Sequence, residues 1–229
     1  MQNILYMTGA GAGDAGYLGS KEEGAAMNSY EEKDYGIFKM FRQWGLVTAG
    51  IPGHFNSCTV GWGSMGVLWA GMESSGAAVT IYLHPDRYTC DFVKEHDTFT
   101  LSFFPAKYKK ALGYMGTHSG RDGDKAAAGL TPVPMGDSMT YEEANLVFLC
   151  RKVYQQQFSK ECMSPEILRY HEGMLPNKPA DGPEGWQPHW FFIGQIMEVK
   201  DVRKEGDQDT DEPFDFRDLF AGMEPPDAK

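Results

Sequence analysis

A β-strand is predicted within the segment Asn56-Ser57-Cys58-Thr59-Val60-Gly61-Trp62-Gly63, which ends in a tryptophan between two glycines. Side chains alternate between the two faces of a strand, so Asn56 and Cys58 point to one side and Ser57 and Thr59 to the other. Glycine lets a ligand approach the backbone, and such a strand suits a flat heteroaromatic ring lying along it. An ordinary barrel strand, with Trp62 in the core and glycines relieving crowding at a bend, accounts for the same pattern.

Short apolar or alternating segments of this kind recur along most of the chain. Strands are predicted over Gly45–Ala49, Ser57–Trp62, Val67–Trp69, Ala78–Leu83, Thr98–Phe103, Leu146–Tyr154 and Trp190–Val199. Many short strands separated by Gly, Pro, Asn and Asp predict a barrel or sandwich. Helical spacing appears only in Tyr88–His96 and Ala106–Met115, which are predicted as helices crossing the barrel.

A phosphate site is predicted at Gly116-Thr117-His118-Ser119-Gly120-Arg121-Asp122-Gly123-Asp124-Lys125. Its glycines expose backbone N–H groups, while Ser119, Arg121 and Lys125 supply hydroxyl and cationic donors. We assign Asp122 and Asp124 to orienting the cations, because carboxylates beside a phosphate would be unfavourable. A polar turn with solvated charges is the alternative interpretation.

The start of the first predicted helix offers further groups for the same anion. Asp86 is expected to cap its amino end, with Arg87 and Thr89 within the first turn. Side chains and free N–H groups at a helix start can converge on an anion.

Composition limits the classes of partner. The 229 residues, 41% of them apolar, can bury the core of one domain. A formal net charge of −11 argues against nucleic acid or an anionic membrane as partner. No apolar run approaches the roughly 18 residues of a membrane span, and the four cysteines form no disulfide framework. A reducing, cytoplasmic location is therefore predicted.

Three regions are expected along the chain. Residues 1–36 contain a Gly/Ala run and many charges, and are predicted to form a flexible arm. The domain itself is expected over residues 37–200. Residues 201–229 are predicted to be an acidic tail.

Cysteine and histidine suggest further roles that the sequence leaves open. Cys58 could be a redox thiol, although a small hydrophobic role is more common for such a residue. His118 could bind phosphate and His189 could line a ligand site, but a solvent-exposed or structural role explains either as well. Because the six histidines are scattered, no metal site is predicted.

Taken in order, several motifs resemble the flavin reductase-like FMN-binding split-barrel family, flavoredoxin type. The motifs are N-x-x-T-x-x-W-G (56–63), R-Y-T (87–89), F-T-L-S-F-F (99–104), Y-K-K-A-L (108–112), G-T-x-S-G-R-D-x-D-K (116–125), G-L-T-P (129–132) and E-E-A-x-L-V (142–147). The resemblance spans about Phe38 to Val199. It implies a Greek-key antiparallel split β-barrel with flanking helices, usually a homodimer that holds non-covalent FMN near the subunit interface.

Carried over to this chain, the resemblance implies a set of cofactor-binding residues. The flavin ring would lie along Asn56, Ser57, Cys58 and Thr59, with Trp62 nearby, and Ser102 and Phe103 bordering it. The phosphate would be bound by Arg87, Thr89, Ser119, Arg121 and Lys125.

The implied activity is that of an NAD(P)H-dependent flavin reductase, in which a hydride reaches bound FMN and the protein supplies orientation and electrostatics. No side chain is needed as acid or base, so no catalytic residue is assigned. Two other functions fit the same residues. One is an electron carrier that a redox protein partner reduces, and the other is a non-catalytic module for FMN or another phosphorylated heterocycle.

Overall fold

The computed structural model describes residues 29–31, 33–70, 75–174 and 185–207. Most of the predicted arm and most of the predicted acidic tail lie outside these residues. The strands are β1 Gly45–Ile51, β2 His54–Val60, β3 Gly63–Val67, β4 Ala77–Leu83, β5 Thr98–Phe103, β6 Pro132–Met135, β7 Ser138–Tyr141, β8 Leu146–Gln157 and β9 Trp190–Asp201. The helices are α1 Ile37–Arg42, α2 Tyr88–Glu95, α3 Lys109–Thr117 and α4 Pro165–Met174, with short 3₁₀ turns at Ala106–Tyr108, Ala126–Ala128 and Lys160–Cys162.

The predicted mainly β class, an antiparallel split barrel with flanking helices, is confirmed. Seven strands form one antiparallel sheet in the order β2-β1-β5-β8-β9-β4-β3, while β6 and β7 form a separate pair. The sequence prediction missed β6, β7, α1 and α4. It also placed the third strand at Val67–Trp69, where the structure has β3 at Gly63–Val67.

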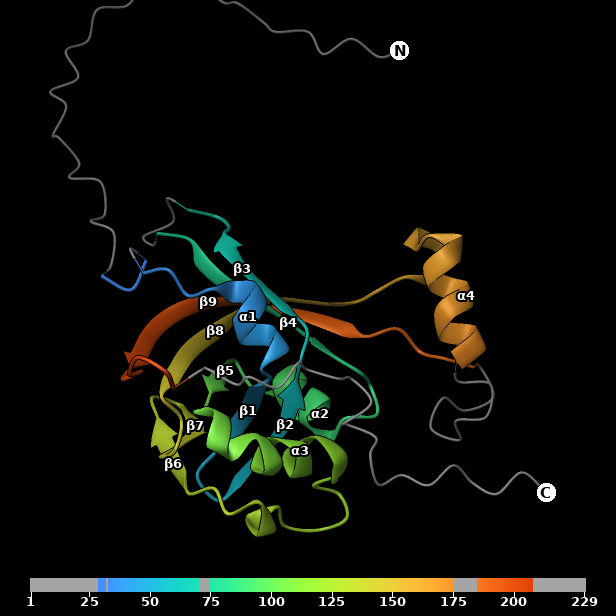
Figure 1. Ribbon diagram of the computed structural model, residues 1–229. Coiled ribbons are helices and arrows are strands. Elements are labelled where there is room, and N and C mark those ends of the chain that lie inside the picture. Colours follow the sequence, from blue (N-terminus) through green and yellow to red (C-terminus); the bar gives the residue numbers. More distant parts are fainter. Residues whose placement is uncertain (1–28, 32, 71–74, 175–184, 208–229) are drawn as a thin grey trace, which may run out of the picture.

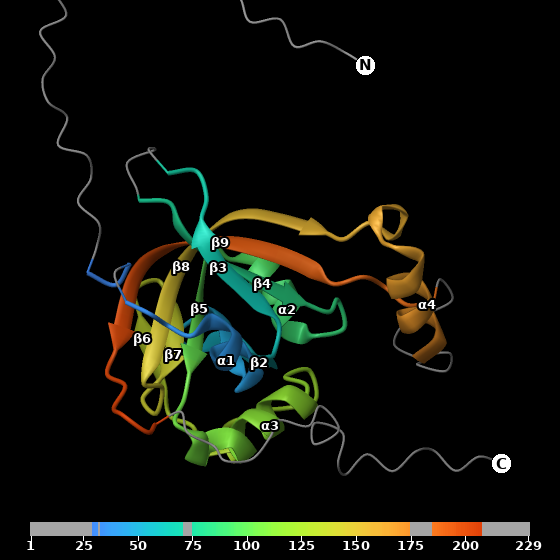
Figure 2. The same ribbon diagram turned by 45° about the horizontal axis from the view of Figure 1, so that its top comes forward.

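The connection between β2 and β3 explains why the sheet curls. These strands occupy opposite edges of the sheet, yet only Gly61 and Trp62 separate them in the chain. Two residues and their flanking bonds span about 10 Å. The two edges must therefore approach each other where β2 ends and β3 begins, which rolls the sheet into an open barrel (Figures 1 and 2).

Alternation along the strands produces two hydrophobic layers. Val47 and Phe148 point into the barrel, where the first core lies. Their neighbours Leu46 and Val147 point outward and form a second core beneath α3 and the β6–β7 pair. The outer side of β1 and β2 is therefore covered, and α3 packs against both strands (Figure 1).

Strands β8 and β9, each 12 residues long, continue beyond the barrel. Helix α4 lies at the far end of this pair, to one side of the barrel (Figures 1 and 2).

Candidate functional site

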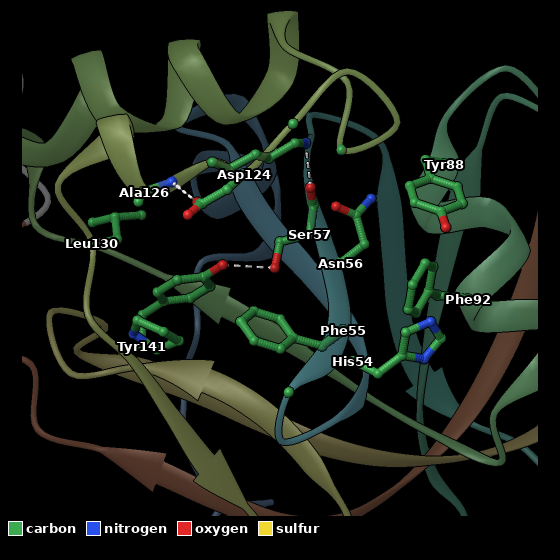
Figure 3. A pocket seen from close by; sticks show the side chains of 15 residues that line it. His54, Phe55, Asn56, Ser57, Tyr88, Phe92, Asp124, Ala126, Leu130 and Tyr141 are labelled. Atoms are coloured by element: carbon green, nitrogen blue, oxygen red, sulfur yellow. Dashed lines mark hydrogen bonds between the residues drawn. The ribbon is translucent and has the colours of Figure 1, made fainter.

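A cavity of about 580 Å³ opens beside the start of β2, at the edge of the barrel. Its walls come from the start of β2, from α2, from the loop after α3 and from β7 (Figure 3). The lining residues are Gly53, His54, Phe55, Asn56, Ser57, Tyr88, Phe92, Gly120, Gly123, Asp124, Lys125, Ala126, Leu130, Pro132 and Tyr141. The volume lies within the range of about 300–1,000 Å³ found for small-molecule sites.

The amide of Asn56 is held in a fixed position. Its Nδ2 donates a hydrogen bond of 2.9 Å to Thr89 Oγ1, which joins β2 to α2. On the other side lies Gly120, where a Cβ atom would come within 2.3 Å of Asn56 Oδ1. Only glycine fits at this position without moving the amide.

Lys125 fastens the loop to the barrel. Its Nζ donates to the main-chain oxygen of Ser57 at 2.6 Å and to that of Met115 at 3.0 Å. Burial lowers the pKa of Lys125 from its ordinary value, and the neighbouring Arg87 adds to this lowering. Arg87 itself donates to the main-chain oxygen of Gly116 at 2.7 Å, so both cations hold the end of α3.

Arg121 is bound on the α2 side of the same loop. It donates to the main-chain oxygen of Asp86 at 2.8 Å and to the carboxylate of Asp91 at 2.5 Å, and its guanidinium lies 4.7 Å from the ring centre of Tyr88. Asp91 therefore orients this cation, and the assignment of that task to Asp122 and Asp124 is wrong for Arg121.

Two details of this region differ from the sequence prediction. The carboxylate of Asp124 accepts the main-chain N–H of Ala126 and so stabilises the following turn. Arg87, and not Asp86, occupies the N-cap position of α2, where no side chain caps the helix. Asp86 instead lies beside His84, with Oδ2 3.4 Å from the Nδ1 atom of that ring. The predicted cap is therefore wrong.

Aromatic side chains form one wall of the cavity. The ring centre of Phe92 lies 4.9 Å from that of His54 and 4.9 Å from that of Tyr88, the latter pair in an edge-to-face arrangement. Such a wall offers an apolar surface to a flat ligand, as Figure 3 shows on the side opposite Tyr141.

The wall opposite the aromatic side chains carries hydroxyl groups. Ser57 Oγ lies 2.8 Å from Thr48 Oγ1 and 2.9 Å from the hydroxyl of Tyr141. Burial raises the pKa of Tyr141 to about 12, so its hydroxyl is neutral at physiological pH.

The structure brings together most of the predicted phosphate-binding residues. Lys125 lines the cavity, while Arg87 and Arg121 hold the loop that borders it. Thr89 supports Asn56 from α2, and Ser119 Oγ accepts the main-chain N–H of Arg121 at 3.2 Å within the loop.

Of the residues predicted to contact the ring, Asn56 and Ser57 line the cavity. Cys58 points into the barrel core, where burial raises the pKa of its thiol. Thr59 Oγ1 donates to the main-chain oxygen of Leu112 at 2.5 Å and so holds α3. Since neither Cys58 nor Thr59 lines the cavity, their contact with a ligand stays a prediction.

Three further predicted residues lie outside this cavity. Ser102 is fully buried and its hydroxyl lies 2.8 Å from that of Thr140, whereas Phe103 belongs to the barrel core. Trp62 is 43% exposed and lines a separate apolar groove of about 750 Å³, with its ring 4.8 Å from His189. Trp62 is thus not a core residue, and a ligand role for these three residues stays a prediction.

Several lining residues were missed by the sequence analysis. Tyr88 and Phe92 stand four residues apart in a helix that was predicted, so their common face could have been noticed next to Arg87. Phe55 precedes Asn56 directly in β2. Tyr141 could not be found in this way, because it belongs to the short strand β7, whose sequence Ser-Met-Thr-Tyr lacks a strong strand signal.

The described residues show neither a metal-ligand cluster nor a membrane-spanning helix. They contain no cluster of three or more His, Cys, Asp or Glu side chains that could hold a metal ion. Among them, no helix is both long and apolar enough to cross a membrane.

Comparisons with known proteins agree with this architecture. Residues 39–215 match the family model described as "Flavin reductase like domain". Flavoredoxin from Methanosarcina acetivorans is 17% identical, with a TM-score of 0.50 over 71% of this chain and 72% of its own. Nitrilotriacetate monooxygenase component B from Mycobacterium thermoresistibile is 11% identical, with a TM-score of 0.50 over 74% of this chain and 78% of its own.

At these identities the two structures establish the fold alone, and no curated protein sequence matches. The family model, in contrast, covers well over half of the chain. The chain therefore belongs to the family of flavin reductase like domains.

Proposed function

We propose that this protein binds FMN non-covalently in the cavity beside β2 and acts as an NAD(P)H-dependent flavin reductase. The proposal depends on one observation. A single cavity of this flavin reductase like domain has a glycine-bearing cationic loop on one side and aromatic and polar side chains along its walls. A phosphorylated heteroaromatic ligand needs both kinds of surface.

The loop after α3 fits the phosphate of FMN. Gly120 and Gly123 line the cavity, and their main-chain N–H groups have no hydrogen-bond partner within the described part of the chain. Lys125 also lines the cavity, and its ammonium carries one more hydrogen than its two bonds to main-chain oxygens use. In a protein of net charge −11, such local donors are what can hold a phosphate dianion.

The walls of the cavity fit the ring of FMN. Tyr88 and Phe92 offer apolar faces, while the amide of Asn56 and the hydroxyl of Tyr141 offer polar contacts. When bound, FMN would supply the chemistry by accepting a hydride from a nicotinamide and passing electrons on. The protein's part is to bind and orient, and we assign no side chain as an acid or base.

We also propose that two copies of the chain form a homodimer. Helix α4 has ten residues and lies at the end of the β8–β9 pair, away from the barrel (Figure 2). Its Ile167 and Tyr170, three residues apart on one face, are 47% and 57% exposed. Within the chain, the ring of His171 on α4 stacks on that of Trp186, with ring centres 4.3 Å apart. Helices this short are marginal in water without packing, and a second copy would cover the exposed face as well.

An absorbance spectrum of the protein after incubation with FMN and desalting tests the proposed function. Retained flavin bands that bleach anaerobically with NADH or NADPH are the expected result. Bands that bleach with dithionite but with neither nucleotide would contradict the reductase and favour an electron carrier served by a protein partner. Absence of any retained flavin would contradict FMN binding itself.

A further inference from the structure

Three hydroxyl groups form a chain that begins in the protein interior and ends at the cavity. Thr48 and Ser57 are directly opposed on β1 and β2, with their oxygens 2.8 Å apart. The hydroxyl of Tyr141, on β7, lies 2.9 Å from Ser57 Oγ (Figure 3). Thr48 is fully buried, whereas Ser57 and Tyr141 line the cavity.

The number of hydroxyl hydrogens decides in which direction the hydrogen bonds of this series are donated. Three hydroxyls carry three hydrogens, but two hydrogen bonds join them, so one hydrogen must be used elsewhere. If Tyr141 donated to Ser57 and Ser57 to Thr48, the remaining hydrogen would lie on Thr48, for which the described residues provide no other acceptor. An unused buried donor is unfavourable.

A second arrangement, in which both neighbours donate to Ser57, leaves the extra hydrogen on Ser57, which is 1% exposed, whereas Tyr141 is 5% exposed. The remaining arrangement runs from Thr48 to Ser57 to Tyr141. It places the free hydrogen on the phenol, at the cavity wall.

The surroundings of Tyr141 keep its hydroxyl available to a ligand. Phe55 and Leu130, which line the cavity beside it, have no polar side-chain atoms (Figure 3). The carboxylate of Asp124, also part of the lining, accepts the main-chain N–H of Ala126, and within the described part of the chain no hydrogen bond joins it to Tyr141. Burial keeps the pKa of Tyr141 near 12, so the hydroxyl retains its hydrogen at physiological pH.

We propose that Tyr141 is a positioning residue of the cofactor site, whose hydroxyl donates a hydrogen bond to an acceptor atom of the flavin ring. Suitable acceptors are a ring carbonyl oxygen or an unprotonated ring nitrogen. The inference rests on the proposed binding of flavin in this cavity. It predicts that the Tyr141 hydroxyl acts on the ring and not on the phosphate.

The test compares FMN with riboflavin, which has the same ring but no phosphate. Fluorescence titration of Tyr141→Phe should show roughly three- to tenfold weaker binding of both flavins, the effect of losing one neutral hydrogen bond. The absorption bands of flavin bound at saturation should shift as well. Tyr108→Phe is the matched control, because Tyr108 packs against the same outer core but does not line the cavity, and it should leave both affinities unchanged.

Thr48→Val provides a second variant that does not touch the cavity. It removes the hydroxyl that donates first in the series Thr48–Ser57–Tyr141, so as a single substitution it should weaken flavin binding. In the double variant with Tyr141→Phe it should cause no further loss of affinity. A merely structural role of Tyr141 would lower the melting temperature without moving the bands of bound flavin. That result would overturn the inference.

Two failures are distinguishable in this experiment. If the wild-type protein binds neither flavin, the proposed function is wrong and the role of Tyr141 is lost with it. If the wild-type protein binds FMN and Tyr141→Phe binds both flavins as tightly, with unchanged bands, the inference alone is overturned.

Discussion

The ammonium group of Lys125 lies 2.6 Å from the main-chain oxygen of Ser57, so a half-buried lysine ties the loop after α3 to strand β2. A second bond, to the oxygen of Met115, fixes the same ammonium to α3. The lysine therefore does two things at once. It closes the cavity wall, and it leaves one N–H of the ammonium for a ligand.

The substitution Lys125→Met should weaken FMN binding by roughly tenfold or more, because a hydrogen bond to a charged group is lost. Riboflavin binding should fall less, since riboflavin lacks the phosphate. Fluorescence titrations with both flavins measure the difference, and Lys110→Met, an exposed lysine on α3, is the control. Combining Arg87→Ala with Lys125→Ala should reduce FMN affinity further. Equal losses for the two flavins would place the phosphate elsewhere.

Gly120→Ala should lower flavin affinity by displacing the amide of Asn56. The added Cβ would lie 2.3 Å from Asn56 Oδ1, so the amide or the loop must move and the bond to Thr89 must weaken. Gly113→Ala in α3 is the matched control, because a Cβ there meets nothing within 4 Å. The control should keep its flavin affinity and gain up to about 1 kcal/mol in stability from helix propensity. Flavin titration and thermal unfolding of both variants measure these effects. Unchanged flavin affinity in Gly120→Ala would contradict the role of Asn56.

The strands with strong apolar alternation were predictable from the sequence, and β5 was placed with its observed ends at Thr98 and Phe103. The resemblance implied a Greek-key split barrel but not the order of the strands in the sheet, because antiparallel pairing between distant segments leaves no local signal. The short strands β6 and β7 were missed, since a four-residue segment with two prolines, or with a serine and a threonine, resembles a loop.

The site was predictable where chemistry and position coincide, as in Asn56 and Lys125. It was not predictable where a residue's surroundings decide its role. Alternation puts Cys58 on the same face of β2 as Asn56, but the barrel closes over the thiol and leaves the amide at its edge. Trp62 lies in the two-residue link that joins the sheet edges, which turns it toward another groove.

Acid should destabilise the protein through Asp201 at the end of β9. Hydrogen bonds from Arg203 lower the pKa of this carboxyl from 3.8 to about 2, with Lys33 contributing as well. Because the folded-state pKa is depressed, the stabilisation is fully present above pH 3.8 and is lost as the pH falls toward 2. The urea midpoints of wild type and Asp201→Asn should therefore differ at pH 5 and converge near pH 2. Asp122→Asn, which changes an exposed carboxylate, is the control. A difference in urea midpoint between wild type and Asp201→Asn that persists at pH 2 would contradict this account.

A double substitution on α4, Ile167→Asp with Tyr170→Glu, should convert the proposed dimer into a monomer. Both side chains are exposed on one face of a ten-residue helix, and charges there would have to be buried against a second copy. Light scattering after size-exclusion chromatography measures the mass of each variant. Val202→Asp is the control, because Val202 is 56% exposed but follows the opposite end of β9 from α4. If wild type and the α4 variant have the same mass, this helix is not the dimer contact, and its exposed face needs a different partner.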